Sequence, residues 1–146
     1  LGEHTMNDAA MNTATNNLKV LIVDDSFLMR RIIRNIVEND PALTIVGEAE
    51  DGVIALEKVN ELSPDIILLD IEMPNMDGIE FLRRSRLVTS AKVIIISSVA
   101  RLDSSEARQA LELGAADIIP KPSGVLSLDF EEKKSRELLD AIHKCL

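Results

Sequence analysis

The stretch Ile66-Ile67-Leu68-Leu69-Asp70-Ile71-Glu72-Met73-Pro74 decides the expected fold of this chain. It opens with an uninterrupted apolar run, which is typical of a strand covered on both faces of a sheet. Far upstream, the run Val20-Leu21-Ile22-Val23 ends in the same way, in Asp24 and Asp25. If the two runs form neighbouring parallel strands, the carboxylates of Asp24, Asp25 and Asp70 meet at one edge of the sheet.

Carboxylates at such short range repel one another and need a cation to offset their charge. Mg²⁺ suits hard oxygen ligands in this arrangement. The sequence therefore predicts a magnesium site beside one reactive carboxylate, that of Asp70. Asp25 and Asp70 are the expected ligands, and Asp24 is expected to lie close by as an outer acceptor.

Apolar runs alternate with helix-periodic segments from Leu18 onward. The predicted strands are 19–24, 43–49, 65–70, 92–97 and 117–120. Between the first two, Met29, Ile32, Ile33 and Ile36 recur at helical spacing. This alternation predicts a doubly wound α/β domain with a parallel sheet, whose crevice lies at the carboxyl ends of the strands.

Some details of the helices are also expected from the sequence. Asp77 is predicted to cap the third helix, with Glu80 reaching back to complete a capping box. The fourth helix is expected to bury Leu111 and to end at Gly114. The last helix is expected to carry Leu138, Leu139, Ile142 and Leu146.

Composition excludes several classes of function. A chain of 146 residues is most simply one domain. It has no Trp or Tyr and only 3 Phe, so it lacks platforms for stacking on bases, and its net charge of −9 disfavours binding to phosphate backbones. No apolar stretch reaches the roughly 20 residues that span a bilayer. Neither nucleic acid binding nor membrane insertion is expected.

The two ends of the chain are expected to differ from its centre. Residues 1–17 have neither a basic start nor an apolar middle, so they are interpreted as a disordered leader or tag remnant rather than a secretory signal. Residues 18–146 are expected to form the domain. The single Cys145 cannot form an internal disulfide, which fits a reducing cytoplasm.

Two further residues complete a site for phosphoryl transfer. A carboxylate that attacks phosphorus needs its charge neutralised and its reactants positioned, so a mobile cation and a short hydrogen-bond donor are useful beside the metal. Lys121, just past the last predicted strand, offers the cation, and Ser97, at the end of the fourth, offers a hydroxyl. Both are expected at the same edge of the sheet as Asp70.

These motifs, in order and spacing, resemble the receiver domains of two-component response regulators. They are Val23-Asp24-Asp25-Ser26, Leu69-Asp70-Ile71-Glu72-Met73-Pro74-Asn75-Met76-Asp77-Gly78, Ile96-Ser97-Ser98 and Lys121-Pro122. The resemblance covers about Leu18 to Leu146. Within the family it extends to the receiver of the chemotaxis protein-glutamate methylesterase, through the paired Ser97-Ser98 and the stretch 111–117 that leads to Lys121-Pro122-Ser123-Gly124.

The resemblance implies a flavodoxin-like (βα)5 fold with strand order 2-1-3-4-5, and it implies roles for single residues. Asp70 would take a phosphoryl group from a chemotaxis histidine kinase. Asp24 and Asp25 would form the acidic pair at Mg²⁺, and Glu72 would add its backbone carbonyl. Ser97 would sense the phosphoryl group and Lys121 would pair with one of its oxygens. The Lys121–Pro122 bond would be cis.

The resemblance also implies an output. The chain would catalyse its own magnesium-dependent phosphorylation and dephosphorylation. In the family, this receiver covers a methylesterase domain, which serves the chemoreceptors, until phosphorylation frees it. This chain has no Gly-x-Ser-x-Gly nucleophile turn. It is therefore expected to be either the regulatory part of such a protein or a stand-alone receiver.

One departure and several alternatives stay open. Ile118 stands where the family usually has Phe or Tyr as a switch, so the signal is expected to rest on Ser97 and the loop 99–103. Asp24 and Asp25 could simply cap a helix, and Lys121 could be a solvated surface residue.

Other classes of function fit parts of the sequence. The chain could be a non-phosphorylated module that binds partners through its last two helices. A nucleotide binder is disfavoured because no Gly-rich loop follows the first strand. A haloacid-dehalogenase-type phosphatase is disfavoured because the motif around Glu72 does not match.

Overall fold

The computed structural model describes residues 17–122 and 128–146. Its strands are β1 (Leu18–Val23), β2 (Leu43–Ala49), β3 (Ile66–Leu69), β4 (Lys92–Ser97) and β5 (Asp117–Pro120). They form one parallel sheet in the order β2-β1-β3-β4-β5. The predicted doubly wound sheet and its strand order are confirmed.

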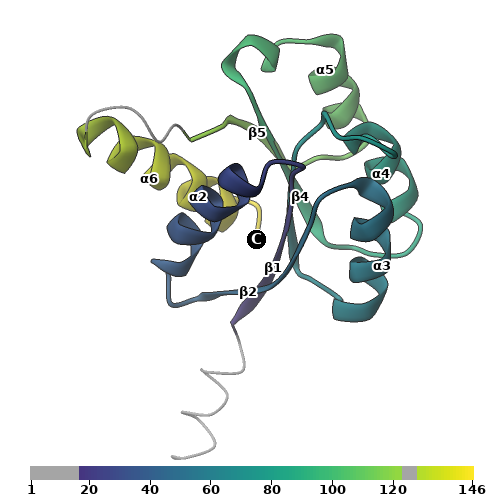
Figure 1. Ribbon diagram of the computed structural model, residues 1–146, viewed down its shortest axis with the longest axis horizontal. Coiled ribbons are helices and arrows are strands. Elements are labelled where there is room, and N and C mark those ends of the chain that lie inside the picture. Colours follow the sequence, from purple (N-terminus) through teal and green to yellow (C-terminus); the bar gives the residue numbers. More distant parts are fainter. Residues whose placement is uncertain (1–16, 123–127) are drawn as a thin grey trace, which may run out of the picture.

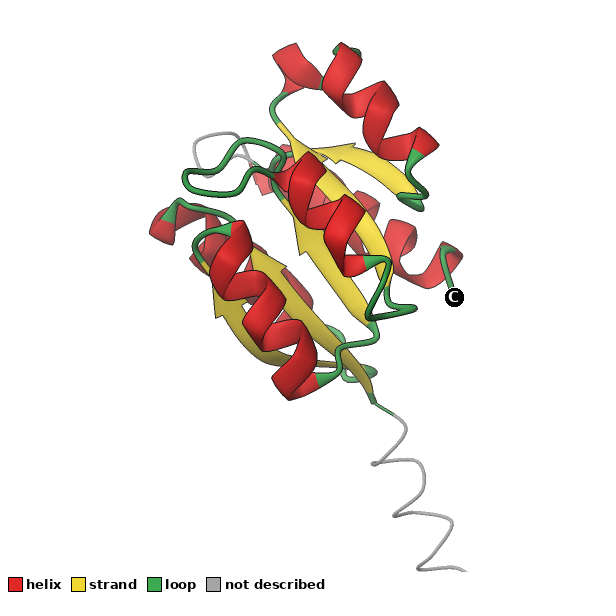
Figure 2. Cartoon of the chain, turned by 90° about the vertical axis from the view of Figure 1, so that its right-hand side faces the viewer, coloured by secondary structure: helices red, strands yellow, loops and turns green. Residues whose placement is uncertain are grey.

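Helices cover both faces of the sheet (Figures 1 and 2). One face carries α2 (Phe27–Glu38) and α6 (Leu128–Lys144), and the other carries α3 (Gly52–Leu62), α4 (Gly78–Ser85) and α5 (Ser105–Glu112). A short 3₁₀ helix, η1 (Val99–Arg101), follows β4.

Each central strand contributes side chains to a hydrophobic core on both faces of the sheet, because its side chains alternate between the faces. In β3, Ile67 and Leu69 pack under α3, α4 and α5, whereas Ile66 and Leu68 pack under α2 and α6. All four are at most 1% exposed. Burial on both faces explains why these strands read as unbroken apolar runs rather than as alternating ones.

The expectations about helix ends are partly right. Asp77 caps α4 by accepting a hydrogen bond from the Glu80 N–H at 2.9 Å. The predicted capping box is wrong, because the Glu80 carboxylate instead accepts from Arg83 at 2.8 Å and Arg84 at 2.9 Å. Residues three and four positions along a helix lie on the same face, so these arginines compete successfully for the carboxylate.

Two apolar residues of the predicted helices are exposed. Leu111 is 48% exposed although Ala107 and Ala110 of the same helix are buried, because α5 is short and Leu111 lies one position beyond its buried stripe. Leu146 was expected on the last helix, but α6 ends at Lys144, and Leu146 lies beyond that end and is 55% exposed.

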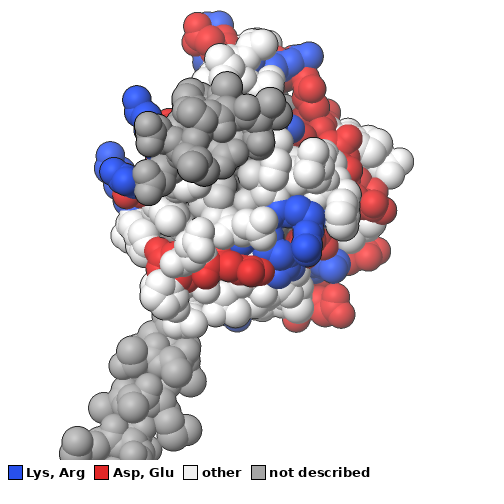
Figure 3. Space-filling view, turned by 60° about the vertical axis from the view of Figure 1, so that its left-hand side comes forward, with Lys and Arg blue, Asp and Glu red and all other residues white. Residues whose placement is uncertain are grey.

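Asn17 is the first residue of the chain that the structure describes. The predicted leader lies outside the described residues except for Asn17, whose side-chain amide donates a hydrogen bond to Thr44 Oγ1 at 3.0 Å. In the described ranges, every helix is too short or too polar to cross a bilayer. On the face of the molecule seen in Figure 3, basic side chains lie among acidic ones rather than in one continuous surface.

An ion-pair network ties α2 to β2. Glu48 accepts hydrogen bonds from Arg30 Nε at 3.0 Å and from Arg34 Nε at 2.6 Å. The Glu48 side chain is 23% exposed, so the network is partly shielded from water.

Replacing Glu48 by glutamine should therefore lower the free energy of unfolding by about 1 kcal/mol, since one charged acceptor serves two guanidinium groups. Urea unfolding followed by circular dichroism measures it. The matched change is Glu57→Gln, at an exposed position of α3 for which the described residues offer no ion pair. Equal losses in the two variants would show that the network adds nothing.

Candidate functional site

Backbone pairing at the ends of β1 and β3 brings the acidic residues together. Val23 and Leu69 are partners in the sheet, and the Asp70 N–H donates to the Val23 carbonyl at 2.9 Å. The Asp24 N–H donates to the carbonyl of Ala49, the last residue of β2, at 3.0 Å. The acids therefore leave neighbouring strands side by side, at the carboxyl edge of the sheet.

Three carboxylates converge at this edge, as the sequence predicted. One oxygen each from Asp24, Asp25 and Asp70 lie within 4.8 Å of one another. Asp24 is 1% exposed and Asp70 is 5% exposed, whereas Asp25 faces solvent. The cluster is a partly buried acidic site that opens to water on the side of Asp25.

The surroundings of Asp24 and Asp70 disfavour the ionised forms of their carboxyl groups. Burial and the neighbouring Asp24 carboxylate raise the pKa of Asp70 to about 6, although Lys121 acts in the opposite direction. Burial likewise raises the pKa of Asp24, with the Ser26 N–H and Lys121 opposing it. Carboxylates kept close together at such a cost are typical of functional sites.

Lys121 lies against two of these acids. Its Nζ is 3.1 Å from Asp70 Oδ2 and 3.4 Å from Asp24 Oδ2. Burial disfavours the charge on Lys121, but the carboxylates of Asp70 and Asp24 outweigh it and raise the pKa of the ammonium group. The predicted cation is therefore part of the cluster.

Ser97 reaches the same edge from β4. It is 3% exposed and pairs with Pro120 across β4 and β5. Its carbonyl accepts a hydrogen bond from the Lys121 N–H at 2.8 Å, which fixes the start of the lysine side chain. The two residues predicted from different motifs thus share one backbone contact.

The donor atoms fit a hard divalent cation. Asp24 Oδ1 accepts from the Ser26 N–H at 2.8 Å. Asp24 Oδ2 is buried and accepts no hydrogen bond of good geometry from the described residues, although it faces the Lys121 ammonium at 3.4 Å. Buried carboxylate oxygens without a hydrogen bond are rare and call for an explanation such as an ion. With Asp25 and Asp70 close by, this oxygen belongs to a set that can hold Mg²⁺.

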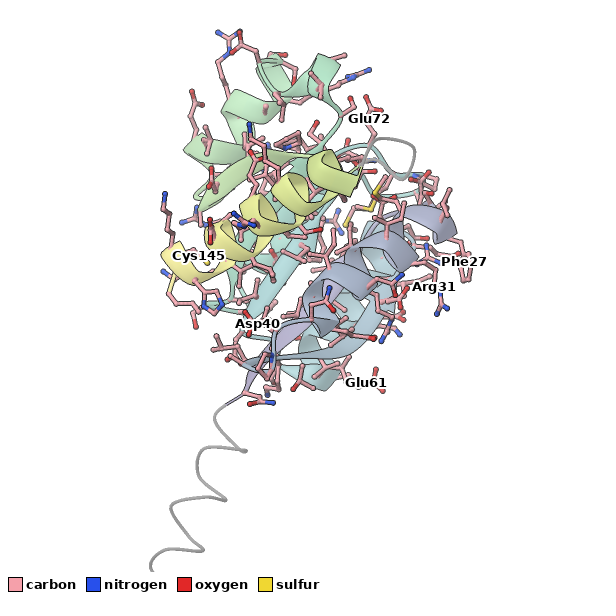
Figure 4. The ribbon with its side chains drawn as sticks, turned by 90° about the vertical axis from the view of Figure 1, so that its left-hand side faces the viewer. Phe27, Arg31, Asp40, Glu61, Glu72 and Cys145 are labelled. Atoms are coloured by element: carbon pink, nitrogen blue, oxygen red, sulfur yellow. The ribbon has the colours of Figure 1, made fainter. Side chains whose placement is uncertain are left out.

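Glu72 follows Asp70 in the loop after β3. Its N–H donates to Asp70 Oδ1 at 3.2 Å, so its backbone lies beside the cluster. Its side chain is exposed on the surface of the molecule (Figure 4) and pairs with Arg101 of η1, with 2.5 Å between Oε1 and Nε. Only the backbone of Glu72 is therefore placed to serve the acids.

The implied cis bond between Lys121 and Pro122 is wrong. The described residues contain no cis peptide bond. The trans form of a bond that precedes proline is favoured by about 0.5–1 kcal/mol, and the contacts of Lys121 form with this bond trans.

Ile118 is half-buried and packs against the core on the side of α5.

A cleft lies away from the acids. It has a volume of about 720 Å³ and lies between β5 and α6, where Asp117, Lys133, Arg136 and Asp140 line it with charges of both signs. Its size does not make it the candidate site, because the clustered carboxylates and the raised pKa of Asp70 are elsewhere.

One contact near the site was missed by the sequence analysis. Asp51, at the corner between β2 and α3, accepts a hydrogen bond from the side-chain amide of Asn75 at 2.8 Å. The sequence contained a local signal for Asp51 alone, because Asp51-Gly52 before a helix-periodic segment is an N-cap pattern. The partner is far away in the sequence and leaves no local pattern.

Comparisons with known proteins agree with this geometry. Residues 20–129 match the family described as response regulator receiver domain. The chain is 48% identical over 124 residues to the protein-glutamate methylesterase/protein-glutamine glutaminase of Halalkalibacterium halodurans, a match that covers 85% of this chain and 35% of that protein. The chain covers only 32% to 37% of the length of such curated relatives.

Solved structures share the fold. The response regulator domain of Thermotoga maritima CheB superposes with a TM-score of 0.78 at 41% identity, over 88% of this chain and 96% of that one. A chain from the complex of the CheA3 P1 domain with CheY6 of R. sphaeroides gives a TM-score of 0.71 at 40% identity, over 88% and 98%. The family match includes the whole acid cluster and Lys121, and the chain belongs to the response regulator receiver domain family.

Proposed function

We propose that this domain is a phosphorylation-dependent switch of a chemotaxis two-component system, which accepts a phosphoryl group on Asp70 with Mg²⁺ as cofactor. The observation that carries the proposal is the arrangement around Asp70. Its carboxylate lies within 4.8 Å of those of Asp24 and Asp25 and 3.1 Å from Lys121 Nζ.

Each residue of the cluster has a separate role in this proposal. Asp24, Asp25, Asp70 and the backbone carbonyl of Glu72 would hold Mg²⁺, which when bound supplies the positive charge that offsets the carboxylates and the phosphoryl oxygens. Asp70 provides the attacking oxygen. Lys121 holds a positive charge beside it, and the buried Ser97 offers a hydroxyl from the neighbouring strand.

Partners follow from the relatives. The complex of a CheA3 P1 domain with CheY6 supports a chemotaxis histidine kinase as the phosphoryl donor. The protein-glutamate methylesterase/protein-glutamine glutaminase of H. halodurans, of which the match covers 35%, supports a parent protein in which this domain would regulate a methylesterase domain that acts on chemoreceptors. The alternative is a stand-alone receiver. The single cysteine, which forms no internal disulfide, supports a cytoplasmic location.

The decisive experiment is phosphorylation by acetyl phosphate, followed by intact-protein mass spectrometry. We expect one phosphoryl group per chain with Mg²⁺, and none with EDTA or in Asp70→Ala. Asp77→Asn is the matched control, because asparagine caps a helix as well as aspartate does and Asp77 is exposed. A wild-type chain that gains no phosphoryl group would make the domain an interaction module instead.

A further inference from the structure

The loop of residues 70–77, here called the acceptor loop, joins β3 to α4 and carries both Asp70 and Glu72. Near its start, the Gly78 N–H donates to the Ile71 carbonyl at 2.7 Å. Its far half contacts the corner between β2 and α3. There, Asn75 Nδ2 donates to Asp51 Oδ2 at 2.8 Å, and the Gly52 N–H donates to the Met76 carbonyl at 3.1 Å.

We infer that Asp51 is a positioning residue for the acid site, because its bond to Asn75 holds the acceptor loop in the shape that lets Glu72 and Asp70 serve one metal ion. The inference rests on the proposed function, since it concerns the binding of Mg²⁺ by the same residues. Among the described residues, the side-chain hydrogen bonds of Asp51 and Asn75 go to Ile54 and to each other rather than to the acids, so we expect their effect to pass through the loop.

Capping a helix does not explain why residue 51 is an aspartate. Asp51 Oδ1 caps α3 by accepting from the Ile54 N–H at 2.9 Å, and serine or asparagine would cap equally well. The second oxygen is used only by Asn75 among the described residues. Asp51 is 6% exposed, and its hydrogen bonds to Ile54 and Asn75 lower the pKa of its carboxyl, so it is an ionised acceptor on both sides.

The conformation of Asn75 indicates that its side chain is needed. Its φ of +67° lies in the left-handed region, where glycine is the least strained residue and asparagine is tolerated. Glycine would suit the backbone but could not reach Asp51. The next contact is equally tight, since a Cβ at Gly52 would lie 2.6 Å from the Met76 carbonyl oxygen.

The hydrogen bond from Asn75 to Asp51 is also independent of the groups that react. Asp70 is bonded to the Glu72 N–H and to Lys121, but these contacts must change when the Asp70 carboxylate reacts. The bond from Asp51 involves no reacting group. Its corner is anchored at the same edge of the sheet, because the Ala49 carbonyl accepts from the Asp24 N–H. It can therefore hold the loop throughout the reaction.

Calorimetric titration of the full chain with Mg²⁺ tests the inference. Asp51→Ser keeps the helix cap but is too short to reach Asn75, and Asn75→Gly keeps the left-handed backbone but removes the amide. We expect each to weaken Mg²⁺ binding about tenfold, as is usual when residues that orient a metal ligand are removed. Urea unfolding without metal provides the check that each variant is folded.

Asp51→Asn is the conservative variant. Its Oδ1 can cap α3 while its Nδ2 donates to Asn75 once that amide is turned over, so we expect nearly wild-type affinity. In phosphorylation by acetyl phosphate, Asp51→Ser should need about tenfold more Mg²⁺ for half-maximal rate, yet reach a rate near wild type at saturation. This split distinguishes loop positioning from a general loss of structure.

Two results would overturn the inference. One is wild-type Mg²⁺ affinity in folded Asp51→Ser and Asn75→Gly. The other is an Asp51→Asn variant as weak as Asp51→Ser, since a bond between the two side chains would then not be the cause. A wild-type chain that binds no Mg²⁺ would overturn the proposed function together with this inference, so the two failures are distinguishable.

Discussion

Asparagine in place of Asp70 is expected to abolish phosphorylation and, in EDTA at neutral pH, to raise the free energy of unfolding. Burial and the Asp24 carboxylate raise the pKa of Asp70 from 3.8 to about 6. At about 1.4 kcal/mol for each unit of pKa, ionising Asp70 costs the folded protein about 3 kcal/mol. That cost already includes the opposing attraction of Lys121. Because the asparagine amide cannot reproduce the hydrogen bonds that the carboxylate accepts, we expect a smaller net gain of about 1–2 kcal/mol.

The pH dependence has a definite sign. A carboxyl with a raised pKa binds its proton more tightly in the folded state, so its presence costs nothing below the pKa of the unfolded chain. The cost grows as the pH rises from about 4 to about 6 and is complete above that. The advantage of Asp70→Asn should therefore be absent at the acid end of this window and full at neutral pH.

Urea unfolding followed by circular dichroism, at both ends of the window, measures the effect. Asp40→Asn is the matched control of opposite sign. His143 and the Ala42 N–H lower the pKa of Asp40, so its loss should destabilise the fold at neutral pH. Adding Mg²⁺ should stabilise the wild type more than Asp70→Asn. An Asp70→Asn variant less stable than the wild type in EDTA at neutral pH would contradict this account.

Alanine in place of Gly78 is expected to cause the largest loss of stability. An added Cβ would lie 2.5 Å from the Asp70 carbonyl oxygen and 2.7 Å from the Ile71 Cα, and both are backbone atoms. Gly78 is buried, so neither α4 nor the acceptor loop can move aside freely. Overpacking against backbone should lower the free energy of unfolding by about 3 kcal/mol.

Gly47→Ala is the matched control for this change. Its nearest atom is the end of the Leu62 side chain at 2.8 Å, which can rotate away. We expect a loss of about 1 kcal/mol or less there, measured by the same urea titration. Equal losses at the two positions would show that the close approach of α4 to Asp70 is not as rigid as described.

Much of the fold could be predicted because local sequence patterns directly reflect it. The apolar runs of β1 and β3 are unbroken since both faces of the sheet are covered, and parallel strands bring Asp24 and Asp70 to one edge. Lys121 and Ser97 could be placed for the same reason, since each follows or ends a strand. Their roles remain predictions.

The features that were missed or wrong depend on competition between distant or alternative partners. The bond from Asp51 to Asn75 joins residues that no periodic pattern connects. Glu80 had two possible partners at short range, and its arginines won over the helix N-terminus. Leu111 has the right residue type for a core but the wrong angular position on a short helix. Tertiary packing decides the first and third cases, whereas competition between neighbours within one helix decides the second.

The central claim is that one metal ion and one phosphoryl group share the acid cluster around Asp70. A crystal structure grown with Mg²⁺ and trifluoroberyllate, a mimic of a phosphoryl group, tests it most directly. We expect the mimic on the Asp70 carboxylate beside Lys121, with a single Mg²⁺ in contact with Asp25 and Asp70. A mimic or metal bound elsewhere, with the three carboxylates left without ligand, would contradict the account.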